Sequence, residues 1–316
     1  MSRVAVASRS FSRHPVLRAE LLARYPEVTF NESGRSLAGA ELAAFLRGHD
    51  KAITALEKIT DDLLAQLPDL KVIGKYGVGL DMIDLAALAR RGVRLGWTGG
   101  VNRRSVSELV IATAISLLRL IPQANTLARD GGWRQLVGRQ LTGKTVGIVG
   151  CGHIGKDLVP LLRAFDCTVL AHDILDFPEF YAAHRVRPVD LDTLLGESDV
   201  VTLHLPLDAS TRGLLSAERL SRLKPGAILI NAARGGLLDE AAVKAMLLDG
   251  RLGGAAFDVF ASEPPEDLDL IRLPNVLVTP HIGGSAEEAV LAMGRAAIDG
   301  LDHARLPEPD GSFPAG

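Results

Sequence analysis

Short apolar, β-branched runs alternate along the chain with amphipathic or alanine-rich stretches. In the first third, these runs predict strands at "VAVAS", "VTF", "KAITAL", "KVIGKYG" and "VRLGW". The stretches between them predict helices over 15–25, 38–48, 61–67 and 84–91. Strands that alternate with helices are typical of a parallel sheet with helical crossovers, so we predict the α/β class.

A second series of strands follows a long apolar segment at 105–120, which predicts a buried helix with Ser105 or Ser107 as its N-cap. Its six apolar runs are "TVGIVG", "TVLAHD", "VVTLHLPL", "AILINAA", "GAAFDVF" and "VLVTPH", and they predict a doubly wound sheet. A final helix over 285–301 follows that sheet, so we expect it to return to the first domain. The Pro- and Gly-rich end after residue 305 predicts a mobile tail.

Composition narrows the possible partners. The chain has 316 residues, 47% hydrophobic and 23% charged, and a formal net charge of −3, so it offers no basic field for nucleic acid or for an anionic membrane. The apolar stretch among the first residues is too short for a signal peptide, and we expect a cytoplasmic protein. The two cysteines, Cys151 and Cys167, have no metal-binding or disulfide spacing, so we expect core residues and no metal site.

The segment "TVGIVGCGHIGKDL" places Gly150, Gly152 and Gly155 between a predicted strand and a predicted helix. This G-x-G-x-x-G spacing in that context predicts a dinucleotide site, because the glycines permit a tight turn and close approach of a pyrophosphate. Asp173 lies 18 residues after Gly155, at a strand end where its carboxylate could bind a ribose hydroxyl. That carboxylate would repel a 2′-phosphate, so NAD is favoured over NADP. A glycine-rich turn without a ligand is the alternative.

Three ionisable residues follow strands of the second series: Arg234, Glu263 and His281. Parallel strands end at one edge of a sheet, so these side chains can converge there. His281 has the chemistry of a proton shuttle, Glu263 could orient it, and Arg234 could clamp a carboxylate and polarise a carbonyl. The alternative is a structural ion pair between Arg234 and Glu263. His204, in "HLPL", is expected to form a wall of the cofactor site rather than to act in catalysis.

Several motifs together resemble one family. They are "VIGKYGVGLDMIDL", "NRRSVSELV", "LTGKTVGIVGCGHIGKDL", "VTLHLPLDASTRGLL", "LINAARGGLLDEAAV", "GAAFDVFASEPP" and "VLVTPHIGGS". Their order and spacing resemble the D-isomer-specific 2-hydroxyacid dehydrogenases, most closely the D-3-phosphoglycerate dehydrogenase branch. The resemblance implies an NAD-dependent enzyme acting on a 2-hydroxy or 2-keto acid, with Arg234, Glu263 and His281 as its catalytic triad.

The resemblance also implies the domain organisation. A Rossmann NAD-binding domain would cover 104–284, and a smaller flavodoxin-like substrate domain would combine 1–103 with 285–316. A homodimer would form around the cofactor domain. The expected substrate contacts are Lys75, Tyr76, Gly77, Val78, Gly79 and Asn102, although Asn102 could instead cap a loop. The expected cofactor contacts are Val78, Gly150, Gly152, His153, Ile154, Gly155, Asp173, His204, Leu205, Pro206, Ala232, Ala233, Arg234, Asp258, His281 and Gly283.

One departure from the family pattern concerns the substrate. Phosphoglycerate dehydrogenases carry an Arg-Ser pair where this chain has Thr54 and Ala55, so the best phosphate-binding residue is missing. Lys75 could supply a cation to a different acid or to a phosphate placed differently. An alternative to the enzyme is a non-catalytic NADH-sensing scaffold of the corepressor type, because such proteins can keep the triad.

Overall fold

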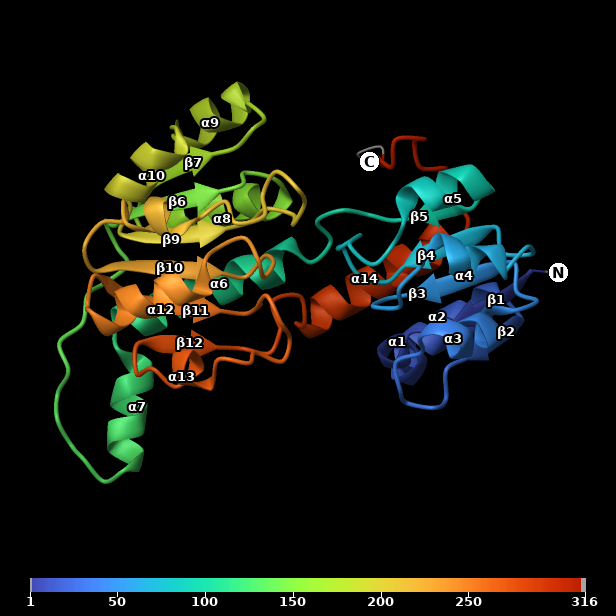
Figure 1. The fold of residues 1–316 in the computed structure, drawn as a ribbon, viewed down its shortest axis with the longest axis horizontal. Helices are drawn as coiled ribbons and strands as arrows, with labels where there is room; N and C mark the ends of the chain where they lie inside the picture. The colour runs from blue at the N-terminus through green and yellow to red at the C-terminus, as the bar shows by residue number, and fades with distance from the viewer. Residues whose placement is uncertain (1, 314–316) are drawn as a thin grey trace. The chain divides into compact units, whose positions relative to one another are not determined.

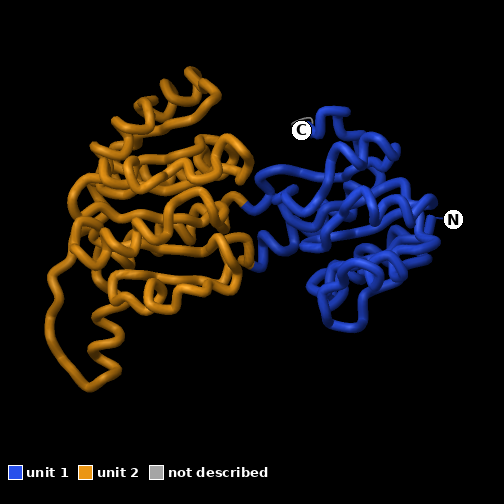
Figure 2. The backbone as a smooth tube through the Cα atoms, in the orientation of Figure 1, with its two compact units in different colours: residues 1–102, 287–316 blue, residues 103–286 orange. Residues whose placement is uncertain are grey.

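The computed structural model describes residues 2–313, and the chain forms two compact units (Figure 2). Unit 1 contains the residues up to Asn102 and those from Glu287 onward, and unit 2 contains Arg103–Ala286. The chain therefore crosses between the units after residues 102 and 286. The sequence predicted crossings after residues 103 and 284.

Unit 1 is built on a parallel sheet in the order β2-β1-β3-β4-β5. Its strands are β1 (Arg3–Val6), β2 (Glu27–Phe30), β3 (Lys51–Thr54), β4 (Val72–Lys75) and β5 (Arg94–Gly96). All five coincide with predicted strands, because each is a short apolar run bounded by polar or turn residues. The order is that of flavodoxin-like sheets, which confirms the α/β prediction.

Helices cover both faces of this sheet (Figure 1). One core contains residues of α3 (Gly39–Leu46), α4 (Asp61–Ala65) and α5 (Leu85–Arg91). The other contains residues of α1 (Arg9–Arg13), α2 (Pro15–Arg24) and α14 (Glu287–Gly300). The five-residue helix α1 was not predicted, since it is shorter than two helical turns and has no full hydrophobic period.

The return of α14 to unit 1 depends on two glycines. A Cβ at Gly74 of β4 would lie 2.4 Å from the carbonyl oxygen of Ala297, and one at Gly96 of β5 would lie 2.1 Å from that of Gly300. Without side chains there, the backbone of α14 packs directly on the two strands. The discontinuous unit is thus closed by backbone contact between segments about 200 residues apart.

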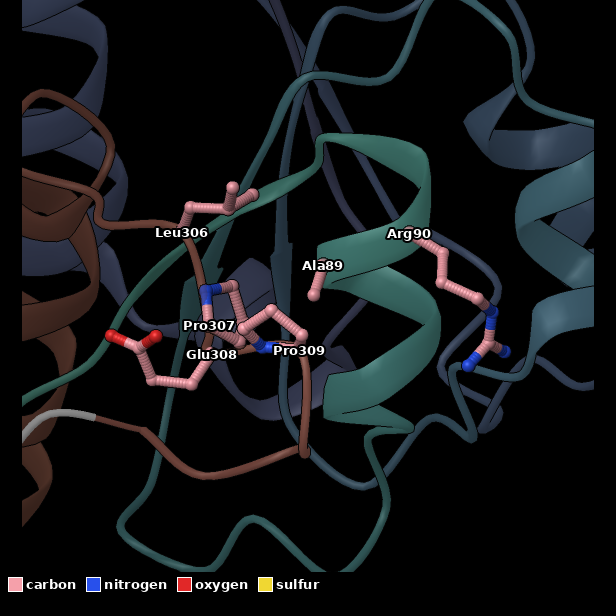
Figure 3. Close-up of a pocket in the computed structure, with 6 residues that line it drawn as sticks. All are labelled: Ala89, Arg90, Leu306, Pro307, Glu308 and Pro309. Atoms are coloured by element: carbon pink, nitrogen blue, oxygen red, sulfur yellow. The ribbon is translucent and has the colours of Figure 1, made fainter.

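The described part of the C-terminal tail contacts other residues of unit 1, and the mobility expected of this end stays a prediction. Arg305 exchanges backbone hydrogen bonds of 2.7 and 3.0 Å with Leu95, and Phe313 makes an edge contact with Trp97 at 5.8 Å. Residues 306–309 line a cavity of about 340 Å³ with Ala89 and Arg90 of α5 (Figure 3). Arg305 lies directly before the predicted tail, and its pairing with Leu95 was not predicted. Residues 314–316 lie outside the described part.

Unit 2 contains a seven-stranded parallel sheet within the described residues, in the order β12-β11-β10-β9-β6-β7-β8. Its strands are β6 (Thr145–Val149), β7 (Thr168–His172), β8 (Arg187–Pro188), β9 (Val200–Leu203), β10 (Ala227–Asn231), β11 (Leu252–Phe257) and β12 (Val276–Val278). The prediction of six strands missed β8, which has two exposed residues at the sheet edge and no apolar signal. Numbered along the chain, the order contains the 3-2-1-4-5-6 arrangement of a Rossmann sheet.

Two hydrophobic cores flank this sheet. One contains residues of α6 (Arg103–Leu118), α8 (His153–Ala164) and α9 (Pro178–His184), and the other contains residues of α10 (Leu191–Glu197), α11 (Ala217–Leu220), α12 (Glu240–Leu248) and α13 (Leu268–Ile271). The buried helix predicted at 105–120 is α6, but it begins at Arg103. Ser105 therefore lies in its first turn and Ser107 in its second, and the prediction that one of them is the N-cap is wrong.

Helix α7 (Ile121–Arg129) and the segment after it project from the body of unit 2 (Figure 1). α7 contains no buried residue, and Trp133 and Val137 are 95% and 93% exposed. Within residues 2–313, no single helix has the length and apolarity to cross a membrane. Among the helices of the described residues, one pair, α6 and α7 with a bend of 64° between them, is long and apolar enough when taken together.

Candidate functional site

The three glycines after β6 have three different surroundings. Gly150 has φ +96°, and a Cβ there would lie 2.5 Å from the carbonyl oxygen of His204. A Cβ at Gly155 would lie 2.5 Å from the carbonyl oxygen of Gly150, so α8 could not approach β6 with any larger residue there. At Gly152, a Cβ would meet nothing within 4 Å. The turn thus requires glycine at two positions for its own packing, and leaves the middle one open for a ligand to approach the backbone.

Asp173 is held against this turn. Its Oδ2 accepts a hydrogen bond of 2.6 Å from the backbone N–H of Cys151, and its Oδ1 accepts one of 2.9 Å from Leu175 N–H. The carboxylate therefore lies beside the glycine-rich turn with a fixed orientation, as a ribose contact requires. Burial and the nearby Asp173 charge raise the pKa of the Cys151 thiol to about 11, which keeps it neutral at physiological pH.

The end of β9 forms the opposite side of the turn. The switch in strand order lies between β6 and β9, where ligands of such sheets bind. His204 Nε2 lies 3.0 Å from Thr202 Oγ1, and its buried Nδ1 has no hydrogen-bond partner within the described residues. Burial lowers the pKa of His204 to about 3, so the ring is neutral. The role of His204 as a wall of the cofactor site stays a prediction.

The other predicted cofactor residues of unit 2 follow the same strand ends. His153 and Ile154 begin α8, Leu205 and Pro206 follow β9, and Ala232 and Ala233 follow β10. Gly150 packs against this group, since a Cβ there would lie 2.9 Å from Leu205 Cδ2. The carboxyl edge of the sheet thus carries an open backbone turn and a fixed carboxylate, which fit the pyrophosphate and ribose of a dinucleotide.

Glu263 and His281 are in direct contact. Glu263 follows β11, His281 follows β12, and the two strands are paired in the sheet. His281 Nδ1 lies 3.0 Å from Glu263 Oε2, while Glu263 Oε1 accepts a 3.3 Å hydrogen bond from Phe260 N–H. Both side chains are about half exposed, at 49% and 41%. The carboxylate thus orients an imidazole that stays accessible to a reactant.

Arg234 follows β10, the neighbour of β11. Its Nη1 donates a 2.6 Å hydrogen bond to the carbonyl oxygen of Ala233. The buried side chain of Asn231 braces the turn, donating to Arg234 O at 2.8 Å and accepting from Ala233 N–H at 3.2 Å. Gly235 lies against the next loop, because a Cβ there would lie 1.9 Å from Phe260 O. The loops that carry Arg234 and Glu263 therefore touch at the backbone.

Asp258, a predicted cofactor residue, is buried at the end of β11 and binds the loop that carries His281. It accepts hydrogen bonds from the hydroxyl of Thr279 and from the backbone N–H groups of Ile282 and Gly283. Sequence reasoning missed Thr279, Asn231 and Gly235 as site residues. The motif "INAARGG" offered a signal for two of them: an asparagine that ends a buried strand, and a glycine after the arginine.

In unit 1, the predicted substrate residues 75–79 follow β4. Lys75 is 4% exposed and its Nζ hydrogen-bonds the carbonyl oxygen of Ala55. Glu57, 5% exposed, accepts a 2.6 Å hydrogen bond from Ala55 N–H. The carboxyl ends of β3 and β4 therefore hold a buried cation and a buried carboxylate on either side of Ala55.

The remaining residues of this loop have defined surroundings. Tyr76 packs edge-on against Phe11 at 5.5 Å, and burial raises its pKa. Gly77 has φ +120°, a conformation that favours glycine, and Val78 O accepts a 2.9 Å hydrogen bond from Trp97 Nε1. Gly79 is half-buried.

Three polar atoms of unit 1 are buried without a hydrogen-bond partner in the described part of the chain: His49 Nδ1, Thr54 Oγ1 and Asn102 Oδ1. Thr54 ends β3, so the last position of that strand carries a buried hydroxyl and no charged side chain.

Two cavities lie outside these sites. One is the cavity of unit 1 beside α5, and the other, of about 490 Å³, is lined by α6 residues such as Glu108 and Leu109 together with Ile282, Ser285 and Ala286. Neither cavity is lined by a predicted site residue. The candidate site is therefore defined by the residues at the carboxyl ends of the strands. Among residues 2–313, no group of three or more His, Cys, Asp or Glu could hold a metal ion.

Comparison with known proteins gives a consistent result. Residues 111–283 match the family model described as D-isomer specific 2-hydroxyacid dehydrogenase, NAD binding domain. The D-3-phosphoglycerate dehydrogenases of Archaeoglobus fulgidus and Bacillus subtilis are 39% and 40% identical over 75% and 76% of this chain, and over 46% of their own length. The chain thus spans about half the length of these relatives. The crystal structure of the TT0316 protein from Thermus thermophilus is 33% identical, with a TM-score of 0.83 over 97% of this chain and 99% of that one.

Proposed function

Because the chain belongs to the D-isomer specific 2-hydroxyacid dehydrogenases, we propose that it uses NAD to interconvert a D-2-hydroxy acid and the corresponding 2-keto acid. The observation that carries the proposal is the 3.0 Å contact between His281 Nδ1 and Glu263 Oε2. It lies at the same sheet edge as Arg234 and the glycine-rich turn, so a proton shuttle and an anion clamp accompany the cofactor site.

The roles follow from the chemistry of each side chain. NADH supplies a hydride to the carbonyl carbon when it is bound. Glu263 accepts the Nδ1 proton of His281, which leaves Nε2 to donate a proton to the carbonyl oxygen in reduction and to accept it in oxidation. Arg234 presents a planar guanidinium that binds the substrate carboxylate and polarises the adjacent carbonyl.

The cofactor is held by groups of unit 2. The backbone at Gly152 and the N-terminus of α8 would receive the pyrophosphate, because the helix end offers unpaired N–H groups and a partial positive charge. Asp173 would accept hydrogen bonds from the adenosine ribose. A 2′-phosphate at that position would face the carboxylate, so the preferred cofactor is NAD.

The backbone of 76–79 and the side chain of Asn102 in unit 1 bind the substrate in this proposal. The unpaired buried oxygen of Asn102 supports that role, because a substrate hydroxyl would satisfy it. Lys75 is the candidate cation for a second acidic group. Thr54 and Ala55 provide no charge for a phosphate, so 3-phosphohydroxypyruvate is one substrate to test rather than the assumed one.

We also propose a homodimer that covers α7 and the segment after it. A nine-residue helix with no buried face is marginal in water by itself. Ile121 of the helix exposes apolar surface, and Trp133 and Val137 in the segment after it expose more. Sedimentation of the wild type and of the double variant Trp133→Asp/Val137→Asp tests this. A wild-type monomer would contradict it.

The enzymatic proposal is tested by following NADH oxidation with a panel of 2-keto acids that includes glyoxylate, pyruvate, oxaloacetate and 3-phosphohydroxypyruvate. Turnover of at least one compound, with strict formation of the D-hydroxy acid, is expected. NADH binding measured by fluorescence, together with no turnover of any compound, would favour the scaffold alternative instead.

A further inference from the structure

The carboxylate of Asp258 is surrounded by donors from one loop. Its Oδ1 accepts 2.5 Å and 2.8 Å hydrogen bonds from Thr279 Oγ1 and Ile282 N–H, and its Oδ2 accepts one of 2.8 Å from Gly283 N–H. The backbone N–H of His281 donates to Asp258 O at 2.9 Å. Every residue of 279–283 except the exposed Pro280 is thus bonded to Asp258, which is itself only 5% exposed.

The loop needs such support because His281 has an unfavourable backbone conformation. Its φ of 55° lies in the left-handed region, which is unfavourable for a non-glycine residue and persists only where the surroundings enforce it. The left-handed turn directs the imidazole toward the loop after β11, where its Nδ1 lies within hydrogen-bond distance of Glu263 Oε2. A relaxed backbone at His281 would turn the ring away from that carboxylate.

A second element holds the other end of the same loop. Ser105 Oγ of α6 donates a 2.6 Å hydrogen bond to Gly283 O and accepts one of 3.3 Å from Ala286 N–H. The loop is therefore fixed between a buried carboxylate on the sheet and a hydroxyl on the helix. Both contacts lie within unit 2.

We propose that Asp258, Thr279 and Ser105 are positioning residues, which act through His281 by holding residues 279–283 in the conformation that joins its imidazole to Glu263. The expected loss of turnover rests on the proposed function, whereas the positioning of His281 does not. The alternative is that Asp258 binds the cofactor directly and that Thr279 is only a packing residue.

Thr279→Val separates these two possibilities, because it removes the hydroxyl donor but keeps the shape of the side chain and leaves Asp258 in place. We expect kcat to fall about 10- to 100-fold, as misplacement of a catalytic group by a fraction of an ångström does, while the Kd for NADH changes less than about twofold. Thr279→Ser restores the hydroxyl and should recover most of kcat. Thr193→Val, at another Thr–Asp hydrogen bond of 2.7 Å in α10, is the matched control and should leave kcat unchanged.

Nitrogen-15 NMR of the histidine side chains gives a readout without turnover. In the wild type, His281 Nδ1 should show the shift of a ring nitrogen bonded to a carboxylate, assigned by its loss in His281→Gln. Thr279→Val should weaken that signature, and Thr279→Ser should keep it. If Thr279→Val melts below the assay temperature, Ser105→Ala provides the same test from the α6 side.

The possible failures are distinct. No turnover by the wild type with any 2-keto acid would reject the proposed function, and the NMR signature would still test the positioning role. An active wild type whose Thr279→Val variant keeps both kcat and the Nδ1 signature would overturn the positioning role alone. A Thr279→Val variant that loses only NADH affinity would also overturn the positioning role, and would favour direct binding of the cofactor by Asp258.

Discussion

His281 Nδ1 lies 3.0 Å from Glu263 Oε2, although the two residues are 18 positions apart and follow different strands. Because β11 and β12 are parallel neighbours, their carboxyl ends present both side chains at one edge. The pair requires His281 to adopt a left-handed backbone, which local preference alone would not select.

Replacing His281 with Ala should lower kcat about 10²- to 10⁴-fold, because general acid catalysis contributes that much, while NADH affinity stays nearly unchanged. Steady-state reduction and NADH fluorescence titration measure the two effects. His303→Ala is the matched control, since His303 also lies near a carboxylate, Asp299 at 3.3 Å, but on the surface of unit 1. An unchanged kcat in His281→Ala would remove His281 from the mechanism.

Arg234→Lys should raise KM for the 2-keto acid about 10- to 100-fold, because a point-charge ammonium cannot make the paired hydrogen bonds of a guanidinium. The measurement is a saturation curve at fixed NADH. Arg219→Lys is the control, since Arg219 also donates a hydrogen bond to a backbone carbonyl, that of Leu214, but is an exposed residue of α11. Equal KM values for the two variants would argue that the carboxylate binds elsewhere.

Asp173→Ala should relax the preference for NADH over NADPH, because the carboxylate that would repel a 2′-phosphate is removed. The ratio of kcat/KM for the two cofactors measures this. Asp176→Ala, three residues later at an exposed position, should keep the wild-type ratio. Retained discrimination in Asp173→Ala would show that the ribose is recognised by other groups.

Gly155→Ala should lower the free energy of unfolding by about 1–3 kcal/mol, because its Cβ would overlap the carbonyl oxygen of Gly150 at 2.5 Å. Gly196→Ala, at another helical glycine, meets only Arg222 O at 3.8 Å and should stabilise α10 by about 0.5–1 kcal/mol. Urea unfolding of both variants checks the pair. Equal stability would mean that α8 does not pack on β6 as closely as the structure has it.

Low pH should reduce the stability of unit 1, because Asp302 becomes protonated. Burial alone would raise the pKa of this carboxyl, but hydrogen bonds from Tyr25 and Lys51 and the charges of Lys51 and Arg24 outweigh it and lower the pKa to about 2. A depressed pKa in the folded state adds stability above the ordinary value of 3.8, and that stability is lost as the pH falls toward about 2.

Thermal melts of the wild type and Asp302→Asn between pH 5 and the acid limit of folding measure this contribution. The variant should melt lower at pH 5 and show a flatter pH dependence. Asp269→Asn, at a carboxylate 84% exposed, is the control and should follow the wild type. Parallel wild-type and Asp302→Asn curves would contradict the prediction.

Local chain geometry made much of this protein predictable from its sequence. The five strands of unit 1, and all strands of unit 2 except β8, are apolar runs with the right length and boundaries. The turn Gly150–Gly155 and Asp173 are separated by a fixed stretch of one strand–helix–strand unit, so their proximity follows from sequence spacing. Arg234, Glu263 and His281 could be assigned to one sheet edge because each follows a parallel strand.

Only the tertiary structure decided which distant groups meet. Asp258 bonds to Thr279 and Gly283, Ser105 bonds to Gly283 from α6, and Gly96 of β5 packs on Gly300 of α14. These partners lie between 21 and about 200 positions apart. Hydrophobic periodicity reports which face of an element is buried, and it contains no information about which distant backbone group will meet that face. That choice is made when the elements pack.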